Sequence, residues 1–389
     1  MSEIKVNSIK GVGASAAAIT VNNTAGTCTA NITNNLSNRN LIINGAMQVA
    51  QRGTSATVGD NSYASVDRFL LSQSGLDEDV TQAQVDVASG TTPYTLGFRK
   101  AFKITNGNQT SGAGAGDFVQ IQQRIEAQNI ANSGWNYTSS SSYITLSFWV
   151  KSSVAQNFYG YFRTKDGTAQ LYPFETGSLT ADTWTKVTKT ISGNSNLTFD
   201  NDNNEGLQFN IAPFWGTTYT GSVSLNAWAA FASGTRTPDY TSTWFTTNDA
   251  TFEITGVQLE VGSVATDFEH RSYAQELTLC ERYFYEHLPD GGGSDPIAVG
   301  SYSNQVRAIL QFPTRMRTDP SIVASNFTNA FYFAYATSYD YFDTIIISNV
   351  SSRAVRIAAS GNVSAPSAGM AVFFGAESTS AKLGFSAEL

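Results

Sequence analysis

The sequence predicts a mainly β protein in four parts: an extended N-terminal segment, an antiparallel β-sandwich, a short connecting helix and a small distal β-domain. Three observations support this prediction. Apolar and polar residues alternate in several short runs, as strands with one buried face require. Turn-forming groups such as Lys165-Asp166-Gly167 separate the runs. Charged residues make up only 14% of the chain, against roughly 25% in an average globular protein, while aromatic residues reach 12%.

The first predicted part is residues 1–62, which contain no Phe, Tyr, Trp or Pro. A segment without large side chains cannot easily bury a core of its own. Its spaced β-branched residues and its Asn, Gly and Thr turns favour short strands that become ordered on other chains or on a scaffold. Disorder is the alternative interpretation of the same composition. We therefore expect an extended anchoring segment.

Residues 63–268 carry the pattern of an antiparallel β-sandwich. One face of the run 143–151 is apolar, and Trp149 lies on the opposite face. The apolar face consists of Ile144, Leu146, Phe148 and Val150. Residues 207–211 alternate in the same way. A change of phase at Thr255-Gly256 predicts a β-bulge in the last strand of this domain, because glycine supplies the unusual dihedral angles.

After His270 the apolar period becomes that of a helix. The predicted stripe consists of Tyr273, Leu277, Cys280 and Phe284. Ser272 followed by Gln275 predicts a capping box at the start of this helix. We expect a helical connector over 269–290 that stops at the glycine-rich run 289–293, and a distal β-domain over 291–389. Cys280 is expected to be a buried thiol; a disulfide with Cys28 is the alternative.

Charge and hydropathy exclude several partners. The net charge is −8 without a basic cluster, which argues against a nucleic-acid partner. No run approaches the ~20 apolar residues that span a bilayer, so we expect no membrane insertion. The start of the chain lacks the apolar region of a signal peptide, which predicts synthesis in a cytoplasm without the usual export.

Several stretches of the sequence resemble structural proteins of tailed bacteriophages, notably tail-fibre and receptor-binding proteins of phages that infect marine and cyanobacterial hosts. The most specific stretches are NLIINGAMQVAQRGTS (40–55) and FEITGVQLEVGSVATDFEHRSYAQELTLCERYFY (252–285). Shorter matches are Tyr63-Ala64, Asp67-Arg68-Phe69, SFWVKSS (147–153) and PFWGTTYTG (213–221). The opening SEIKVNSI is similar to the start of such fibres. Residues 297–389 lie outside the resemblance.

The resemblance implies a jelly-roll middle domain similar to carbohydrate-binding modules, a homotrimer, and attachment to other virion tail proteins through residues 1–62. It also implies a distal end that faces the host. We therefore expect a non-enzymatic tail fibre, assembled in the bacterial cytoplasm and located on the virion tail, that adheres to host surface polysaccharide. Three copies would add weak contacts through avidity. The alternatives are a capsid fibre or tail adaptor with a purely structural role, and a capsule depolymerase.

No catalytic constellation and no cofactor site is predicted. His270 and His287 lie near several glutamates, but their spacing is not that of a metal site, and connector or surface roles explain them. The loop 200–206 is rich in the oxygen donors that calcium prefers. Its calcium candidates are Asp200, Asp202, Asn204 and Glu205, although the loop lacks an EF-hand pattern and an ordinary Asx-rich turn explains it equally.

Aromatic residues supply the candidate ligand contacts. Trp215 and Tyr219 lie in a Gly- and Thr-rich loop, where an aromatic face can stack on a sugar ring. The segment 331–343 is the stronger candidate for host contact, because tyrosines give a large contact area with few rotatable bonds. Its candidates are Tyr332, Tyr335, Tyr339 and Tyr341. Packing at a trimer interface is the competing interpretation of this cluster.

Overall fold

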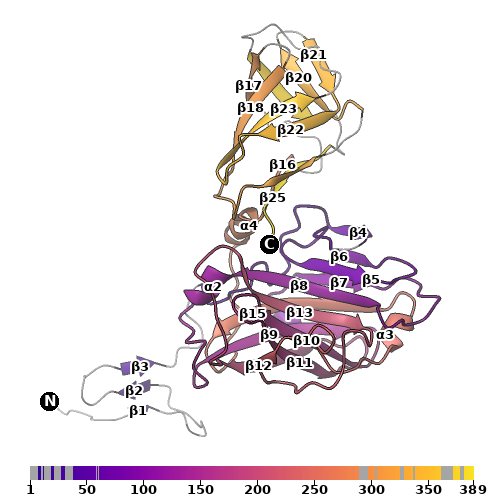
Figure 1. The fold of residues 1–389 in the computed structure, drawn as a ribbon, viewed down its shortest axis with the longest axis vertical. Helices are drawn as coiled ribbons and strands as arrows, with labels where there is room; N and C mark the ends of the chain where they lie inside the picture. The colour runs from indigo at the N-terminus through magenta and orange to yellow at the C-terminus, as the bar shows by residue number, and fades with distance from the viewer. Residues whose placement is uncertain are drawn as a thin grey trace, which may run out of the picture.

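The computed structural model describes residues 8–9, 12, 19–21, 28–30, 38–57, 59, 61–288, 297–302, 305–324, 328–335, 338–360, 371–376 and 381–389. Within these residues, three N-terminal strands are followed by a two-sheet sandwich and a second β-domain (Figure 1). The mainly β fold class predicted from the sequence is confirmed. The helices are short: α1 (Thr92–Thr95), α2 (Ala127–Ala131), α3 (Thr243–Thr246) and α4 (Tyr273–Glu281).

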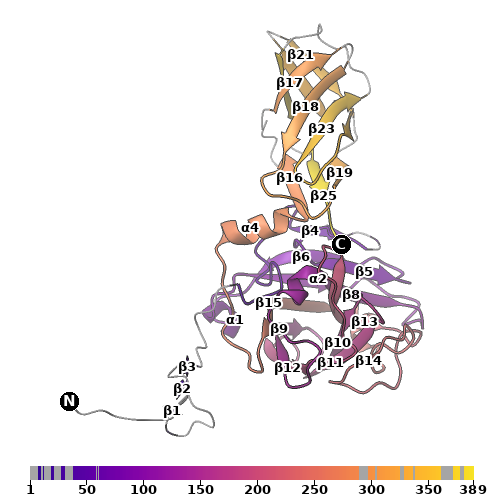
Figure 2. The same ribbon diagram turned by 60° about the vertical axis from the view of Figure 1, so that its left-hand side comes forward.

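The N-terminal strands form a small antiparallel sheet of their own. These are β1 (Ser8–Ile9), β2 (Ile19–Val21) and β3 (Cys28–Ala30). Both views place this sheet beyond the sandwich, on the side away from the second β-domain (Figures 1 and 2). Ile9 is exposed, in keeping with strands too short to bury a core. Apart from these strands and residue 12, residues 1–37 lie outside the described residues, and so does the Cys28 side chain.

The sandwich consists of two six-stranded antiparallel sheets in a jelly-roll-like arrangement. The first sheet, in spatial order, contains β14 (Ala229–Ala230), β11 (Gln170–Ser178), β10 (Asn157–Thr164), β13 (Glu205–Trp215), β8 (Phe118–Glu126) and β5 (Leu70–Ser74). The second contains β12 (Thr185–Ser192), β9 (Tyr143–Ser152), β15 (Thr251–Val261), β7 (Lys100–Thr105), β6 (Thr81–Asp86) and β4 (Ser55–Thr57).

The core lies between these sheets and is largely aromatic. The predicted apolar face of β9 is confirmed, because all four of its residues are at most 2% exposed. The Phe148 ring meets those of Phe174 and Phe209 on the opposite sheet, with ring centroids 6.3 and 6.2 Å apart. Trp149, on the other face, packs on a second small cluster around Phe98 and Ala101.

The predicted β-bulge in β15 is also confirmed. The register between β15 and β9 shifts between Thr255 and Gln258. Gly256 has a φ of +64°, and a Cβ on this residue would lie 2.7 Å from the Phe98 ring. Glycine is therefore required at this position by both the backbone and the neighbouring ring.

The expected boundary of the anchoring segment at residue 62 is wrong. Ile42, Met47 and Val49 have no exposed surface and contribute to the sandwich, and β4 is an edge strand of its second sheet. A segment without aromatic residues cannot build a core alone, but its few aliphatic side chains can fill a core that other residues supply. The sandwich therefore begins near residue 38.

The capping box at α4 is confirmed, whereas the predicted end of the helix is wrong. The Ser272 side chain accepts from the N–H of Gln275, and the Gln275 side chain accepts from the N–H of Ser272. The helix ends at Glu281. Residues Phe284–Leu288 form strand β16, because they pair with β25 (Leu383–Ser386), a partner that is distant in sequence. The second β-domain therefore begins at residue 284 and not at 291.

This second domain, the barrel domain, contains a three-stranded sheet of β16, β25 and β19 (Ser321–Ala324) and a seven-stranded sheet. In spatial order the larger sheet is β21 (Ser338–Phe342), β20 (Phe331–Tyr335), β24 (Ala371–Ala376), β17 (Ile297–Tyr302), β18 (Gln305–Gln311), β23 (Ala354–Ser360) and β22 (Thr344–Ser348). Only Asp343 separates the two edge strands, so the sheet curls until its edges approach. Val306, Ala308 and Leu310 of β18 are buried and face the interior of this domain.

Candidate functional site

Residues 38–47, here called the strap, complete the second sheet of the sandwich at its bulge. Strand β7 pairs with β15 only from Thr251 to Ile254. Beyond the bulge the strap takes over: Leu41 N–H donates to Leu259 O, and Val257 N–H donates to Gly45 O, each at 2.9 Å. The bulge thus separates the part of β15 that pairs with β7 from the part that holds the strap.

The Asn40 side chain fixes the register of the strap. Its amide nitrogen donates to Val257 O at 3.1 Å, and its oxygen accepts from the N–H groups of Ile42 and Leu259 at 3.0 Å each. Asn40 is only 5% exposed, so these bonds satisfy a buried amide. A longer or charged side chain would leave some of these buried groups without a partner.

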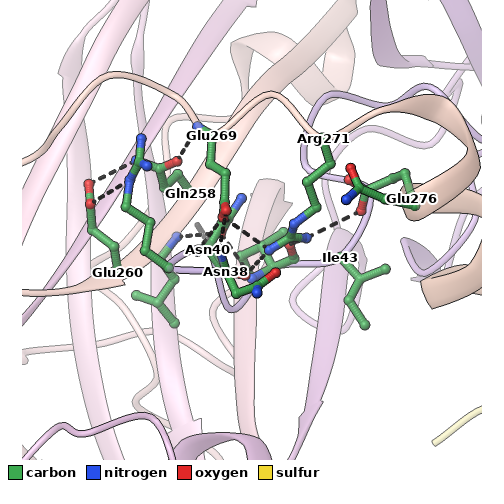
Figure 3. A network of polar contacts seen from close by, with 12 residues as sticks. Asn38, Asn40, Ile43, Gln258, Glu260, Glu269, Arg271 and Glu276 are labelled. Carbon is green, nitrogen blue, oxygen red and sulfur yellow. Dashed lines mark hydrogen bonds and ion pairs between the residues drawn. The ribbon is translucent and has the colours of Figure 1, made fainter. Parts of the chain in front are cut away.

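Three charged residues around the start of α4 form hydrogen bonds with the main chain of the strap (Figure 3). The Glu269 carboxylate accepts from the N–H groups of Asn38 and Asn40. Arg271 donates to the carbonyls of Asn40 and Ile42 and pairs with Glu269 at 3.2 Å and with Glu276 at 3.5 Å. Glu276 accepts from Asn44 N–H, and burial raises its pKa.

These contacts join the two stretches that carry the resemblance, 40–55 and 252–285. The sequence pattern assigned them to different parts of the chain, whereas the structure brings them into contact. The charge clamp formed by Glu269, Arg271 and Glu276 was missed, although the run FEHRSYAQE (268–276) has an unusual density of charge for this chain. That density was the signal that could have identified it.

A cavity of about 660 Å³ opens beside the strap, between α2, α4 and the end of β15. Its polar lining includes Asn38, Asn129 and Arg271, and its apolar lining includes Leu41, Val261 and Leu279. No acidic residue lines it. Its volume falls in the ~300–1,000 Å³ range of small-molecule sites.

The junction between sandwich and barrel domain is ionic and buried. Glu126, which has no exposed surface, accepts from Arg282 Nε and Nη2 at 2.7 Å each and from the Tyr283 hydroxyl at 2.6 Å. Although burial raises it, these hydrogen bonds leave the pKa of Glu126 below its usual range. The Arg68 guanidinium lies over the Tyr283 ring and pairs with Glu388. The two domains are therefore held in one orientation.

Trp215 is not available as a stacking platform. It is 3% exposed, stacks on Phe118 with ring centroids 4.4 Å apart, and meets Tyr219 edge-on at 4.7 Å. The Arg236 guanidinium covers both rings, 4.5 Å from the centroid of Trp215 and 4.8 Å from that of Tyr219. The structure thus brings Trp215 and Tyr219 together, but in a packed cluster; of these two residues, Trp215 is buried and Tyr219 is partly exposed.

Tyr332 of β20 and Tyr339 and Tyr341 of β21 lie on the outer surface of the barrel domain. Tyr332 and Tyr341 are register partners, and the Tyr332 ring meets Tyr339 at 5.5 Å and Tyr341 at 6.3 Å, both edge-to-face. Tyr339 is 63% exposed. Tyr335 belongs to β20, and its side chain lies outside the described residues.

Phe373 on the neighbouring strand β24 extends this surface, although it was not among the contact residues predicted from the sequence. Its register partner on β20 is Ala334, which in turn pairs with Tyr339, so all three point outward. Phe373 is 59% exposed. We call Tyr332, Tyr339, Tyr341 and Phe373 the aromatic face. The signal was the continuous run Val372-Phe373-Phe374, in which alternate residues of a strand must face opposite sides.

The calcium candidates make other contacts. Asp202 accepts from the N–H and the side chain of Asn204, and Glu205 lies 3.6 Å from both Arg124 and Lys165. The Asp200 N–H donates to Asp166 at 3.0 Å. The loop also serves the junction, because Asn203 O accepts from Arg317 at 3.0 Å. In the described part of the chain, no three His, Cys, Asp or Glu residues are grouped as a metal site.

The two histidines do not share a site. His270 Nε2 lies 2.9 Å from Leu96 O, and its ring packs on Phe98 and Phe268. His287 is buried in β16, where its Nδ1 lies 3.1 Å from the Tyr285 hydroxyl. Cys280 is a buried free thiol, as expected. None of the helices within the described ranges combines the length and hydropathy needed to cross a bilayer.

No protein-family model and no curated protein matches this sequence. Among solved structures, a CBM4 module is 15% identical, with 56% of this chain and 98% of that chain covered and a TM-score of 0.29. The N-terminal cellulose-binding domain of Cellulomonas fimi β-1,4-glucanase C is 10% identical, with 56% and 99% covered and a TM-score of 0.26. The CBM22 tandem of Paenibacillus barcinonensis Xyn10C is 8% identical, with 88% and 99% covered and a TM-score of 0.25. These structural neighbours are carbohydrate-binding modules, and similarity at this level carries no argument about function.

Proposed function

We propose that this protein is a non-enzymatic adhesion protein of a tailed phage, a tail fibre whose barrel domain binds host surface polysaccharide. The observation that carries this proposal is the aromatic face. Four large side chains lie side by side on the outside of β21, β20 and β24, where an isolated soluble domain gains nothing from exposing them.

The geometry of the face suits a sugar ligand. Tyrosine rings offer a flat apolar surface to the C–H groups of a pyranose, and their hydroxyls can bond to its oxygens. The Tyr332 ring lies against Gly375, where a Cβ would approach it to 2.5 Å, so the glycine leaves the room that this ring occupies. A ring held in this way loses little conformational entropy on binding.

The arrangement of the chain fits a fibre. The strands β1–β3 lie on the side of the sandwich away from the barrel domain (Figure 2). Anchoring to other tail proteins through the N-terminal strands would leave the aromatic face free. Three copies in a homotrimer would multiply weak contacts.

The test is binding of labelled full-length protein to host cells and to their purified polysaccharide. The double variant Tyr339→Ala/Phe373→Ala is expected to bind at least 10-fold more weakly, because both side chains are mostly exposed parts of the face. Tyr143→Ala, on the sandwich, is the matched control and should bind as the wild type does. Wild-type binding by the double variant would contradict the proposal.

Two further measurements separate the proposal from its alternatives. If the double variant changes the sedimentation mass of the protein, the aromatic face is an interface between copies and not a receptor site. Electron microscopy of gold-labelled virions should place the protein on the tail; a label confined to the capsid would contradict the fibre assignment.

A further inference from the structure

We infer that the cavity beside the strap is a second ligand site, and that it takes a neutral saccharide of one or two rings. This inference relies on the proposed adhesion function for the choice of saccharides as the ligand class. It concerns a different surface from the aromatic face, because the cavity lies between the strap, α2 and α4 in the sandwich.

The cavity offers hydrogen-bonding groups that the protein itself does not use. The side chains of Asn38 and Asn129 make no hydrogen bond within the described residues. The Arg271 side chain is only 10% exposed, yet its Nε–H has no partner there. This nitrogen is shut off from solvent, whereas the amides of Asn38 and Asn129 are exposed and within reach of a ligand. Amides beside it can donate to one hydroxyl and accept from its neighbour.

The apolar part of the lining completes the match to a sugar. Leu41, Val261 and Leu279 line the same cavity, and Val261, the last residue of β15, is 40% exposed although residues 252–260 are buried. A pyranose has apolar C–H patches between its hydroxyls, so a mixed wall of amides and aliphatic groups suits it. A purely apolar ligand would leave the amides of Asn38 and Asn129 unpaired.

Charge selects a neutral ligand. The two cations in the lining, Arg39 and Arg271, are already paired: Arg39 lies 3.3 Å from Glu260, and Arg271 lies 3.2 Å from Glu269 and 3.5 Å from Glu276. Three carboxylates therefore surround two guanidinium groups. An acidic saccharide would gain little attraction and would face the excess negative charge.

The experiment is calorimetric titration of the full-length protein with a panel of neutral disaccharides: maltose, cellobiose, lactose and diacetylchitobiose. At least one is expected to bind saturably, and 3′-sialyllactose is expected to bind more weakly than lactose. Asn129→Trp and Leu279→Trp fill the cavity from two sides and should each weaken binding at least 10-fold. Asn108→Trp, at another exposed asparagine, is the control and should bind normally.

Each variant is checked by its thermal midpoint and near-ultraviolet circular dichroism, so that loss of binding is scored only on folded protein. Absence of binding by every neutral disaccharide would overturn the inference. Binding that survives both cavity variants would also overturn it, as would tighter binding of the sialylated sugar than of lactose. The variant Tyr339→Ala/Phe373→Ala should keep disaccharide binding here while losing adhesion, so failure of this inference and failure of the proposed function are separate results.

Discussion

Arg282 and Glu126 form a bidentate ion pair, with both nitrogen–oxygen distances at 2.7 Å, across the boundary between the two large domains. Glu126 stands at the end of β8 in the sandwich, and Arg282 follows α4, just before the barrel domain. The carboxylate has no contact with solvent. An acceptor buried to this extent must be matched by donors, and it therefore fixes the position of the chain that supplies them.

Replacing Arg282 by Met should destabilise the protein by about 3 kcal/mol, because it leaves a buried carboxylate with only Tyr283 and Gln128 as donors. Urea unfolding monitored by fluorescence measures the change. The exposed pair Lys100–Asp86 is the control: Lys100→Met should cost less than about 1 kcal/mol. Equal losses in the two variants would show that the junction does not depend on this pair.

Ionisation of Asp67 should lower the free energy of unfolding as the pH rises through weakly acidic values. Burial raises the pKa of this carboxyl to about 6 from its usual 3.8. The folded state then binds the proton more tightly than the unfolded state does. The contribution of Asp67 to the free energy of unfolding is therefore fully present below pH 4 and declines up to about pH 6. Each pKa unit corresponds to about 1.4 kcal/mol, so the decline should be on the order of 2–3 kcal/mol.

The measurement compares wild type and Asp67→Asn by urea unfolding between pH 4 and pH 7. The difference isolates Asp67 from groups with the opposite sign, such as Glu126, whose lowered pKa gives stability that is lost on acidification. Relative to wild type, the variant should become progressively more stable as the pH rises. A constant difference across this range would refute the shift.

Gly45→Ala should release the strap. A Cβ on Gly45 would lie 2.1 Å from Val257 O, so the strap would have to move away from the bulge. Overpacking of this kind costs about 1–3 kcal/mol. Hydrogen exchange at the amides of Leu41 and Val257 should accelerate at least 10-fold. Gly116→Ala, where a Cβ meets nothing within 4 Å, should leave these rates unchanged.

Trp215→Leu should lower stability by about 2–4 kcal/mol without changing adhesion, because Trp215 is a packed residue that supports Phe118 and Arg236. Thermal unfolding and polysaccharide binding are measured on the same preparation. Tyr339→Ala should show the reverse pattern, with normal stability and weakened adhesion. Loss of adhesion in folded Trp215→Leu would show that Trp215 contributes to receptor binding.

Local patterns determined much of the architecture from the sequence alone. The apolar alternation of 143–151, the glycine at the bulge and the Ser272–Gln275 capping box were predicted and are present. Each depends on neighbours within a few residues, so a short stretch of sequence is enough to predict it. The tyrosines of 331–343 were predicted as host contacts from their side-chain chemistry alone; the structure places them on β20 and β21, and their role stays a proposal.

Only tertiary structure decided which distant segments meet. The strap joined the sandwich because Asn40 and Glu269 satisfy groups more than two hundred residues away in the chain. The end of the predicted helix is instead strand β16, because these residues pair with β25. Trp215 became a core residue because Arg236 folds over it. Such contacts are set by burial and by the pairing of polar groups across the whole fold, which no local spacing records.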